Sequence, residues 1–162
     1  MAKLIIKGST EYALKLSKLA EQSRPIAQKA IYRAAGMVTD EIRKNIKELP
    51  VRGANERGTG TKPTKGVTKK EKVGLLDGLG ITKFGDKDGY YNVKVGFDGY
   101  NEDKTKKYPN GKPNQMIAGS VESGTSWLQK TPFVEPAVKK TKKKAIEVIQ
   151  QVIDEETKKV MG

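Results

Sequence analysis

The spacing of apolar residues predicts long amphipathic helices at both ends of this chain. In residues 11–22, and again in residues 25–48, they recur every three or four positions, as on one face of a helix. Pro25 lacks the N–H that a helix interior needs, so it is expected to begin the second helix. The same spacing predicts a helix over residues 134–161, and residues 3–7 predict a short strand ahead of the first helix.

Each helix is expected to carry one apolar face. On the first it consists of Tyr12, Ala13, Leu16, Leu19 and Ala20. On the second it consists of Ala27, Ala30, Ile31, Ala34, Val38, Ile42 and Ile46. On the C-terminal helix it consists of Val138, Ala145, Ile149, Val152 and Ile153. The alanines on the face of the second helix indicate that a sheet or another helix approaches it closely.

An alternation of apolar and polar residues marks the middle of the chain. Residues 79–84 and 90–97 follow this pattern, which is typical of half-buried strands. Asp88-Gly89 between them is a favoured turn pair, so an antiparallel hairpin is expected. Tyr91, Val93, Val95 and Phe97 are expected to share one face of the second strand.

Two polar segments interrupt these patterns. Residues 51–73 and 98–113 hold few apolar side chains, so they bury too little surface to offset the entropy of ordering them. We expect the first to be a long, mobile basic loop or arm and the second to be a polar insertion. A short helix is expected over residues 114–122, with Met116, Ile117 and Val121 pointing inward.

Together these elements predict a single α+β domain, residues 1–162. A small antiparallel sheet is expected to pack against long N-terminal and C-terminal helices. The long polar loops are expected to lie outside the core.

An apolar corner over residues 121–139 joins the short helix to the C-terminal helix. Gly124 is expected to end the short helix, because glycine takes positive φ freely. Thr131 followed by Pro132 is typical of a helix start, with a hydroxyl cap before a proline at the first helical position. Trp127 and Phe133 are expected to be hinge and packing anchor at an interface, or ordinary core residues.

The chain is strongly basic, with 32 Lys and Arg residues against 19 Asp and Glu residues and a formal net charge of +13. Such a charge favours anionic partners, although lysines that only solvate a polar surface give the same count. Just five of the basic residues are arginine, the side chain used most by readers of bases and phosphates. No apolar run is long enough to predict a membrane span.

Catalytic groups are scarce. The chain has no histidine and no cysteine, which removes histidine-based triads, thiol nucleophiles, disulfides and thiolate metal sites. Glu122 and Glu135 flank the corner, and paired carboxylates can do acid–base work, but a hydrogen bond to backbone or to a nearby lysine is the simpler role for Glu122. No motif frames a Ser-Lys dyad. We predict a protein that is not an enzyme and that uses no cofactor and no metal.

A series of short motifs resembles the tail-completion or neck proteins of long-tailed phages, the lambdoid gene-ten-like family. The motifs are residues 5–8 (IIKG), 74–81 (GLLDGLGI), 95–100 (VGFDGY), 112–118 (KPNQMIA) and 121–137, which contain VESGTS and PFVEPA. Gly78 stands where the family usually has serine, and Glu135 stands where it usually has arginine. The resemblance covers most of the chain except residues 51–73.

This resemblance implies a structural virion protein of siphophages, assembled in the host cytoplasm and located in the neck or at the tail end nearest the head. Members are thought to form a ring, usually six-fold, around the channel through which DNA passes. The implied partners are copies of the chain, the tail terminator or tail tube, the head connector, and DNA in the channel. The alternative is a basic nucleic-acid-binding protein, although no recognisable DNA-binding or RNA-binding motif is present.

Candidate interface residues lie in the two polar segments, at the corner and on the C-terminal helix. Basic arms of this kind become ordered against neighbouring proteins or contact phosphates. The candidates are Arg52, Arg57, Lys62, Lys65, Lys69, Lys70, Lys104, Lys106, Lys107, Trp127, Phe133, Lys139 and Lys143.

Overall fold

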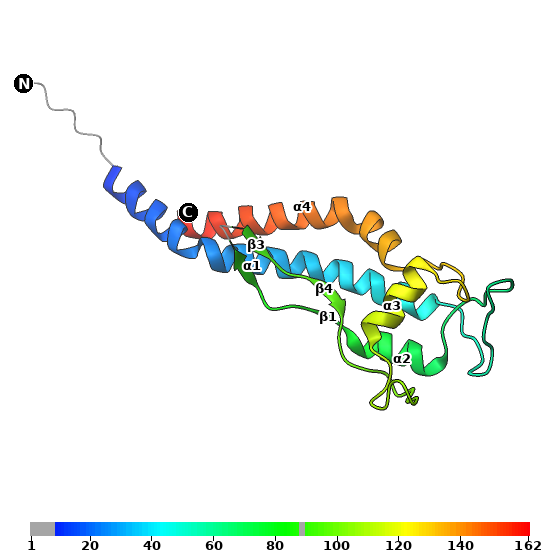
Figure 1. Ribbon diagram of the computed structural model, residues 1–162. Helices are drawn as coiled ribbons and strands as arrows, with labels where there is room; N and C mark the ends of the chain where they lie inside the picture. The colour runs from blue at the N-terminus through cyan, green and yellow to red at the C-terminus, as the bar shows by residue number, and fades with distance from the viewer. Residues whose placement is uncertain (1–8, 88–89) are drawn as a thin grey trace, which may run out of the picture.

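Two long helices lie side by side along most of the molecule (Figure 1). The computed structural model describes residues 9–87 and 90–162, so the strand predicted at residues 3–7 lies outside the described residues. Helix α1 spans Ser9–Glu48, and helix α4 spans Val134–Met161. The predicted bounds of the C-terminal helix are therefore confirmed.

Helix α1 runs without interruption through Pro25, so the predicted break between two N-terminal helices is wrong. An internal proline costs a helix roughly 3 kcal/mol, because it removes one hydrogen bond and crowds the preceding turn. Pro25 itself is exposed, while Ile26, Ala30 and Ala34 in the following turns are buried. Packing of these turns against α4 offsets the local cost, which the sequence pattern alone did not include.

The two long helices are antiparallel and approach closely through small side chains. Ion pairs join Lys29 to Glu156 and Lys140 to Glu41, so the end of α4 lies beside the middle of α1 and the start of α4 lies beside the end of α1. The predicted face of α4 is partly wrong, because Val138 and Ile153 are exposed. The buried positions are Ala137, Thr141, Ala145 and Val152.

The buried face of α4 was hard to predict because it is made of small residues, which contribute little to an apolar pattern. Thr141 is buried on this face, and its hydroxyl donates a hydrogen bond to the Ala137 carbonyl at 2.7 Å. A hydroxyl satisfied within its own helix can be buried at little cost.

The middle of the chain forms the expected hairpin in two short ladders. Strand β1 (Leu79–Ile81) pairs with β4 (Val95–Phe97), and β2 (Gly85–Lys87) pairs with β3 (Tyr90–Asn92), both antiparallel. The predicted turn at Asp88-Gly89 lies outside the described residues. The predicted face is confirmed, because side chains alternate between partly buried and exposed along the second half of the hairpin. The partly buried ones are Tyr91, Val93, Val95 and Phe97.

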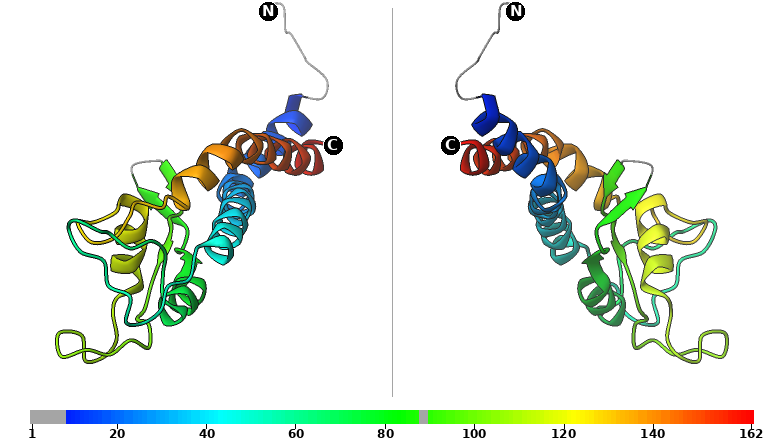
Figure 2. Two further views of the ribbon diagram at one scale, coloured as in Figure 1. Left: turned by 90° about the vertical axis from the view of Figure 1, so that its right-hand side faces the viewer. Right: turned by 90° about the vertical axis from the view of Figure 1, so that its left-hand side faces the viewer.

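Two short helices complete the fold, and together with the strands they lie to one side of the two long helices, α1 and α4 (Figure 2). Helix α2 spans Lys69–Gly78 and helix α3 spans Asn114–Ser123. Ile117 and Val121 point into the core as predicted, but Met116 is exposed. The core lies where α2, α3, β1 and β4 meet the ends of α1 and α4. Its main members are Ile42, Ile46, Leu49, Val67, Leu75, Leu79, Ile117, Val121, Leu128, Phe133 and Ala137.

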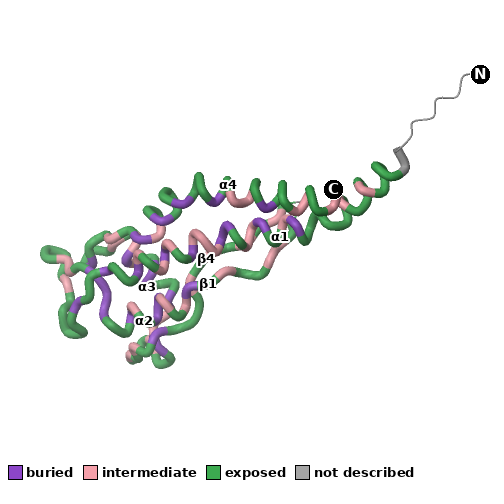
Figure 3. Tube along the Cα trace, turned by 180° about the vertical axis from the view of Figure 1, so that it is seen from behind, coloured by how far each residue is buried: buried purple, intermediate pink, exposed green. Residues whose placement is uncertain are grey.

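This arrangement confirms the α+β class, with small antiparallel sheets beside long N-terminal and C-terminal helices. Figure 3 shows buried positions gathered between the long helices and around the short ones. The N-terminal turns of α1, in contrast, are mostly exposed.

The corner between α3 and α4 matches its prediction where α3 ends but not where α4 begins. Gly124 ends α3 with φ of 75°, and its N–H donates to the Ser120 carbonyl at 2.9 Å, which confirms its predicted role. Thr131 and Pro132 do not start α4, which begins two residues later. A distant carboxylate caps this helix instead.

The cap of α4 is Glu122 on the preceding helix. Its carboxylate accepts hydrogen bonds from the backbone N–H groups of Phe133, Val134 and Glu135 at 2.8, 2.9 and 2.8 Å. These amides at the start of a helix have no partner within the helix itself, and the helix dipole favours a negative charge there. The simpler role foreseen for Glu122, a bond to backbone, is confirmed.

Replacing Glu122 with alanine is expected to lower the free energy of unfolding by about 1–3 kcal/mol, because three helix-start amides lose a charged acceptor. Urea unfolding followed by circular dichroism measures this. Glu147→Ala, on the exposed face of α4, is the matched control and is expected to change stability by less than about 0.5 kcal/mol. Equal stabilities of the two variants would contradict the capping role.

Candidate functional site

The segment at residues 51–73 is not the unpacked arm that its composition predicts. Its last residues, from Lys69 onward, belong to α2, and Val67 is fully buried. The Arg52 N–H donates to the Val67 carbonyl at 2.8 Å, and the Val67 N–H donates to the Pro50 carbonyl at 2.9 Å. The expectation that this segment buries little is wrong, because it folds around a charge pair that composition does not show.

That charge pair joins Arg52 to Glu71, both of which are buried. The Nη2 atom of Arg52 lies 3.2 Å from Oε1 and 3.1 Å from Oε2 of Glu71. Its other nitrogens donate to the carbonyls of Gly66 and Glu56, both at 3.2 Å. The guanidinium therefore meets several acceptors inside the fold, as a buried charge must.

Glu71 also forms a capping box at the start of α2. Its Oε2 accepts the Thr68 N–H at 2.9 Å, and its own N–H donates to the Thr68 hydroxyl at 3.2 Å. One carboxylate therefore caps a helix and neutralises a buried arginine. The spacing Thr68-x-x-Glu71 before an apolar run is a recognisable helix-start pattern, and it was the signal by which α2 could have been predicted.

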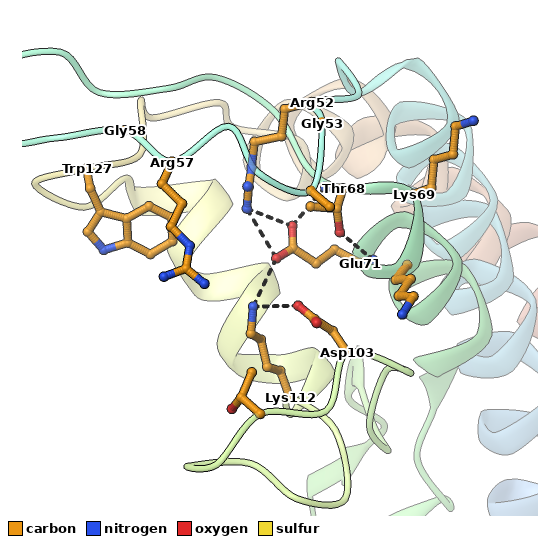
Figure 4. Close-up of a pocket in the computed structure, with 13 residues that line it drawn as sticks. Arg52, Gly53, Arg57, Gly58, Thr68, Lys69, Glu71, Asp103, Lys112 and Trp127 are labelled. Carbon is orange, nitrogen blue, oxygen red and sulfur yellow. Dashed lines mark hydrogen bonds and ion pairs between the residues drawn. The ribbon is translucent and has the colours of Figure 1, made fainter.

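A cavity of about 750 Å³ opens beside this pair. Figure 4 shows its walls: the segment from Arg52 to Gly58, the start of α2, the loop that carries Asp103 and Lys112, and Trp127 on the far side. We call it the cationic pocket.

Backbone contacts hold the walls of the cationic pocket. The Thr64 N–H donates to the Trp127 carbonyl at 3.0 Å, and the Gln129 N–H donates to the Thr64 carbonyl at 2.7 Å. A Cβ on Gly58 would lie 1.9 Å from the Trp127 carbonyl oxygen, so only glycine permits this close approach. The segment before α2 is thereby attached to the corner that carries Trp127.

Backbone contacts also fix the loop that carries Asp103 and Lys112. The Asn101 N–H donates to the Lys112 carbonyl at 2.9 Å. Gly111 has φ of 99°, and a Cβ there would lie 1.9 Å from the Asn101 carbonyl oxygen. These bonds define the direction in which Lys112 enters the cationic pocket.

Positive charge dominates the cationic pocket. Its lining holds five cationic side chains and two carboxylates. Both carboxylates are paired, Glu71 with Arg52 and Lys112, and Asp103 with Lys112 at 2.7 Å. The remaining cations have no ion pair within the part of the chain that the structure describes. They are Arg57, Lys69 and Lys70.

The pKa of Asp103 is lowered by the positive charge of the cationic pocket. The hydrogen bond from Lys112 lowers the pKa of this carboxyl below its ordinary value, and the charges of Lys112, Lys70 and Arg57 lower it further. Burial acts in the opposite direction but does not cancel the lowering. The cations at the rim therefore act on groups inside the cationic pocket.

The structure brings together five of the predicted candidates, Arg52, Arg57, Lys69, Lys70 and Trp127. The other predicted residues do not line the cationic pocket, and they are scattered over loops, core and α4. They are Lys62, Lys65, Lys104, Lys106, Lys107, Phe133, Lys139 and Lys143. Sequence reasoning missed Glu71, Asp103 and Lys112, which lie far apart in the chain.

Trp127 and Phe133, for which the sequence predicted similar roles, have different environments. Phe133 is 1% exposed and belongs to the core. Trp127 is 41% exposed and forms one wall of the cationic pocket. The core alternative therefore describes Phe133, whereas Trp127 is available to a partner.

Apolar residues on the N-terminal turns of α1 form a second candidate surface. Tyr12 is 58% exposed and Leu16 is 44% exposed, and Leu19 is partly buried. Leu16 follows Tyr12 by four residues and Leu19 follows Leu16 by three, and the buried Ile26 lies a further seven residues, about two helical turns, along the same side of α1. This part of α1 extends past the end of α4 (Figure 1). We call Tyr12, Leu16 and Leu19 the overhang face.

Within residues 9–87 and 90–162, every helix is too short or too polar to span a bilayer. The same residues contain no cluster of three or more acidic side chains that could hold a metal ion.

The fold and the two surfaces define an α+β protein with two long antiparallel helices, a cationic pocket at one end and an uncovered apolar helix face at the other. Comparison with protein-family models, with curated proteins and with solved structures gives no match for this chain.

Proposed function

We propose that this chain is a structural virion protein of a long-tailed phage, acting in tail completion or head–tail joining. It assembles with its own copies into a ring around the DNA channel and bridges the tail terminator or tail tube and the head connector. Its role is structural and not catalytic. The motifs that resemble the neck family support the phage assignment, and the overhang face supports self-assembly.

Three motifs of the resemblance, at residues 74–81, 95–100 and 112–118, contact one another in space, which supports treating them as one signature. Asn114, in the motif at residues 112–118, donates from Nδ2 to the Asp98 carbonyl at 2.9 Å. A Cβ on Gly78 would lie 2.3 Å from the same carbonyl oxygen. Glycine in place of the family's usual serine therefore allows α2 and the end of β4 to approach closely.

The overhang face is the observation that carries the assembly role. An apolar stripe that continues beyond its own partner helix leaves surface that another chain can cover.

Replacing Leu16 with glutamate is expected to prevent self-association, because it places a charge in the overhang face. The mass in solution, measured by light scattering at low and high salt, is expected to fall from a ring or other oligomer to a monomer. Leu14→Glu is the matched control. Leu14 is 59% exposed and lies on the opposite side of the helix, since two residues turn a helix by about 200°.

The light-scattering measurement is repeated with tail tubes added to the protein. A ring, or a monomer recruited only by tubes, supports the proposal. A monomer that ignores tubes and forms a salt-sensitive complex with DNA contradicts it and favours the alternative, a basic nucleic-acid-binding protein. Equal effects of Leu16→Glu and Leu14→Glu contradict the role of the overhang face.

A further inference from the structure

We propose that the cationic pocket binds an acidic peptide segment, rich in aspartate and glutamate, of a neighbouring protein. This inference names a partner surface for the proposed assembly role, and it rests on that role only for the origin of the peptide. Binding itself is a property of the pocket and can be measured on the isolated chain.

The first argument is the excess of positive charge in a concave site. Glu71 and Asp103 already have partners, while Arg57, Lys69 and Lys70 have no ion pair among the described residues. Like charges held around one cavity repel one another, and a ligand with several negative charges removes that repulsion. The start of α2 adds the positive end of a helix dipole at the same place.

The second argument is that the pocket is already formed. The contacts of Gly58 with Trp127 and of Gly111 with Asn101 hold its walls, and the pair Arg52–Glu71 fixes its floor. A volume of about 750 Å³ accommodates a ligand of several side chains. A site that needs little rearrangement loses little binding energy to ordering.

The third argument concerns the kind of anion. The cations of the pocket already bind carboxylates, with Lys112 beside Asp103 and Arg52 beside Glu71. Lysines are compact point charges that suit single carboxylates, whereas recognition of phosphate and bases uses the arginine fork more heavily. The exposed indole of Trp127 supplies an apolar wall for the aliphatic part of an acidic side chain.

The shape of the pocket argues against duplex DNA as its ligand. A duplex presents its phosphates on the outside of a rod, and such a surface does not enter a cavity with walls from four segments of the chain. A flexible peptide can place successive carboxylates at Arg57, Lys69 and Lys70.

Trp127 makes the test specific, because it is the only tryptophan in the chain and lines the pocket. The full-length protein is titrated with a short end-blocked peptide of alternating aspartate and glutamate, and Trp127 fluorescence is recorded. We expect a saturable change that weakens as salt rises from about 50 mM to about 500 mM, since salt screens exposed charges. Inorganic pyrophosphate and oligothymidylate serve as phosphate probes.

Two variants locate the binding. K69Q/K70Q is expected to weaken peptide affinity about tenfold, because two partly screened charge contacts are lost. K143Q/K144Q removes the same charge from an exposed stretch of α4 outside the pocket and is expected to change affinity less than about twofold. Circular dichroism confirms that both variants remain folded.

Three outcomes would overturn the inference. They are no fluorescence change with the peptide, equal weakening by both double variants, and a response to pyrophosphate or oligothymidylate without one to the peptide. The titration does not depend on whether the chain forms rings. Loss of peptide binding therefore overturns this inference alone, whereas a monomer that ignores tail tubes overturns the proposed function alone.

Discussion

Replacing Glu71 with alanine is expected to lower the free energy of unfolding by about 3–5 kcal/mol, because it breaks a buried ion pair from one side. Arg52 would then remain buried without its carboxylate, which lies 3.1 Å away in the native fold. The Thr68 N–H would also lose its acceptor at the start of α2. Urea unfolding followed by circular dichroism gives the loss directly.

The matched control for this prediction is Glu56→Ala, which removes the same charge from an exposed side chain of the same segment. It is expected to change stability by less than about 0.5 kcal/mol. The double variant R52M/E71A is expected to recover part of the loss, since an apolar side chain can replace a buried charge that has no partner. A loss below about 1 kcal/mol for Glu71→Ala would contradict the structural role given to this pair.

Replacing Phe133 with alanine is expected to destabilise the fold by a similar amount, about 3–5 kcal/mol, because it opens a cavity in the core. Phe133 is 1% exposed, and its ring meets that of Phe97 edge to face, with centroids 5.9 Å apart. It lies where the corner, the end of β4 and α1 meet, and its carbonyl accepts a hydrogen bond from Asn45 at 3.0 Å. Thermal unfolding is expected to show a lower midpoint.

The stability of Trp127→Ala is compared with that of Phe133→Ala, because the sequence predicted similar roles for both residues at the corner. Trp127 is 41% exposed, so its truncation is expected to cost less than about 1 kcal/mol of stability. Its effect is expected on peptide binding, measured by calorimetry because the fluorescent reporter is lost. A large stability loss for Trp127→Ala, or a small one for Phe133→Ala, would reverse the assignment of core and surface roles.

The candidate site was predictable only in part. Arg52, Arg57, Lys69 and Lys70 stand in one stretch of sequence, so their basic character was visible at once. Composition could not distinguish Arg52, which is buried and paired, from Arg57, which has no ion pair among the described residues. That distinction depends on Glu71, because a carboxylate held by a capping box fixes which cation enters the interior.

Local patterns determined the features of this protein that depend on neighbouring residues. The helical spacing of residues 134–161, the alternation that places Val93 and Val95 on one partly buried face, and the end of α3 at Gly124 all follow from backbone geometry over a few positions. These features are those of an α+β fold, and the structure confirms them.

Tertiary structure decided the features that depend on distant partners. Helix α1 continues through Pro25 because α4 covers the following turns, and α4 starts at Val134 because Glu122, on another helix, accepts its first amides. The segment before α2 packs because Arg52 meets Glu71 across 19 residues. Each of these outcomes rests on a contact between groups far apart in the chain, and no local pattern encodes the energy of such a contact.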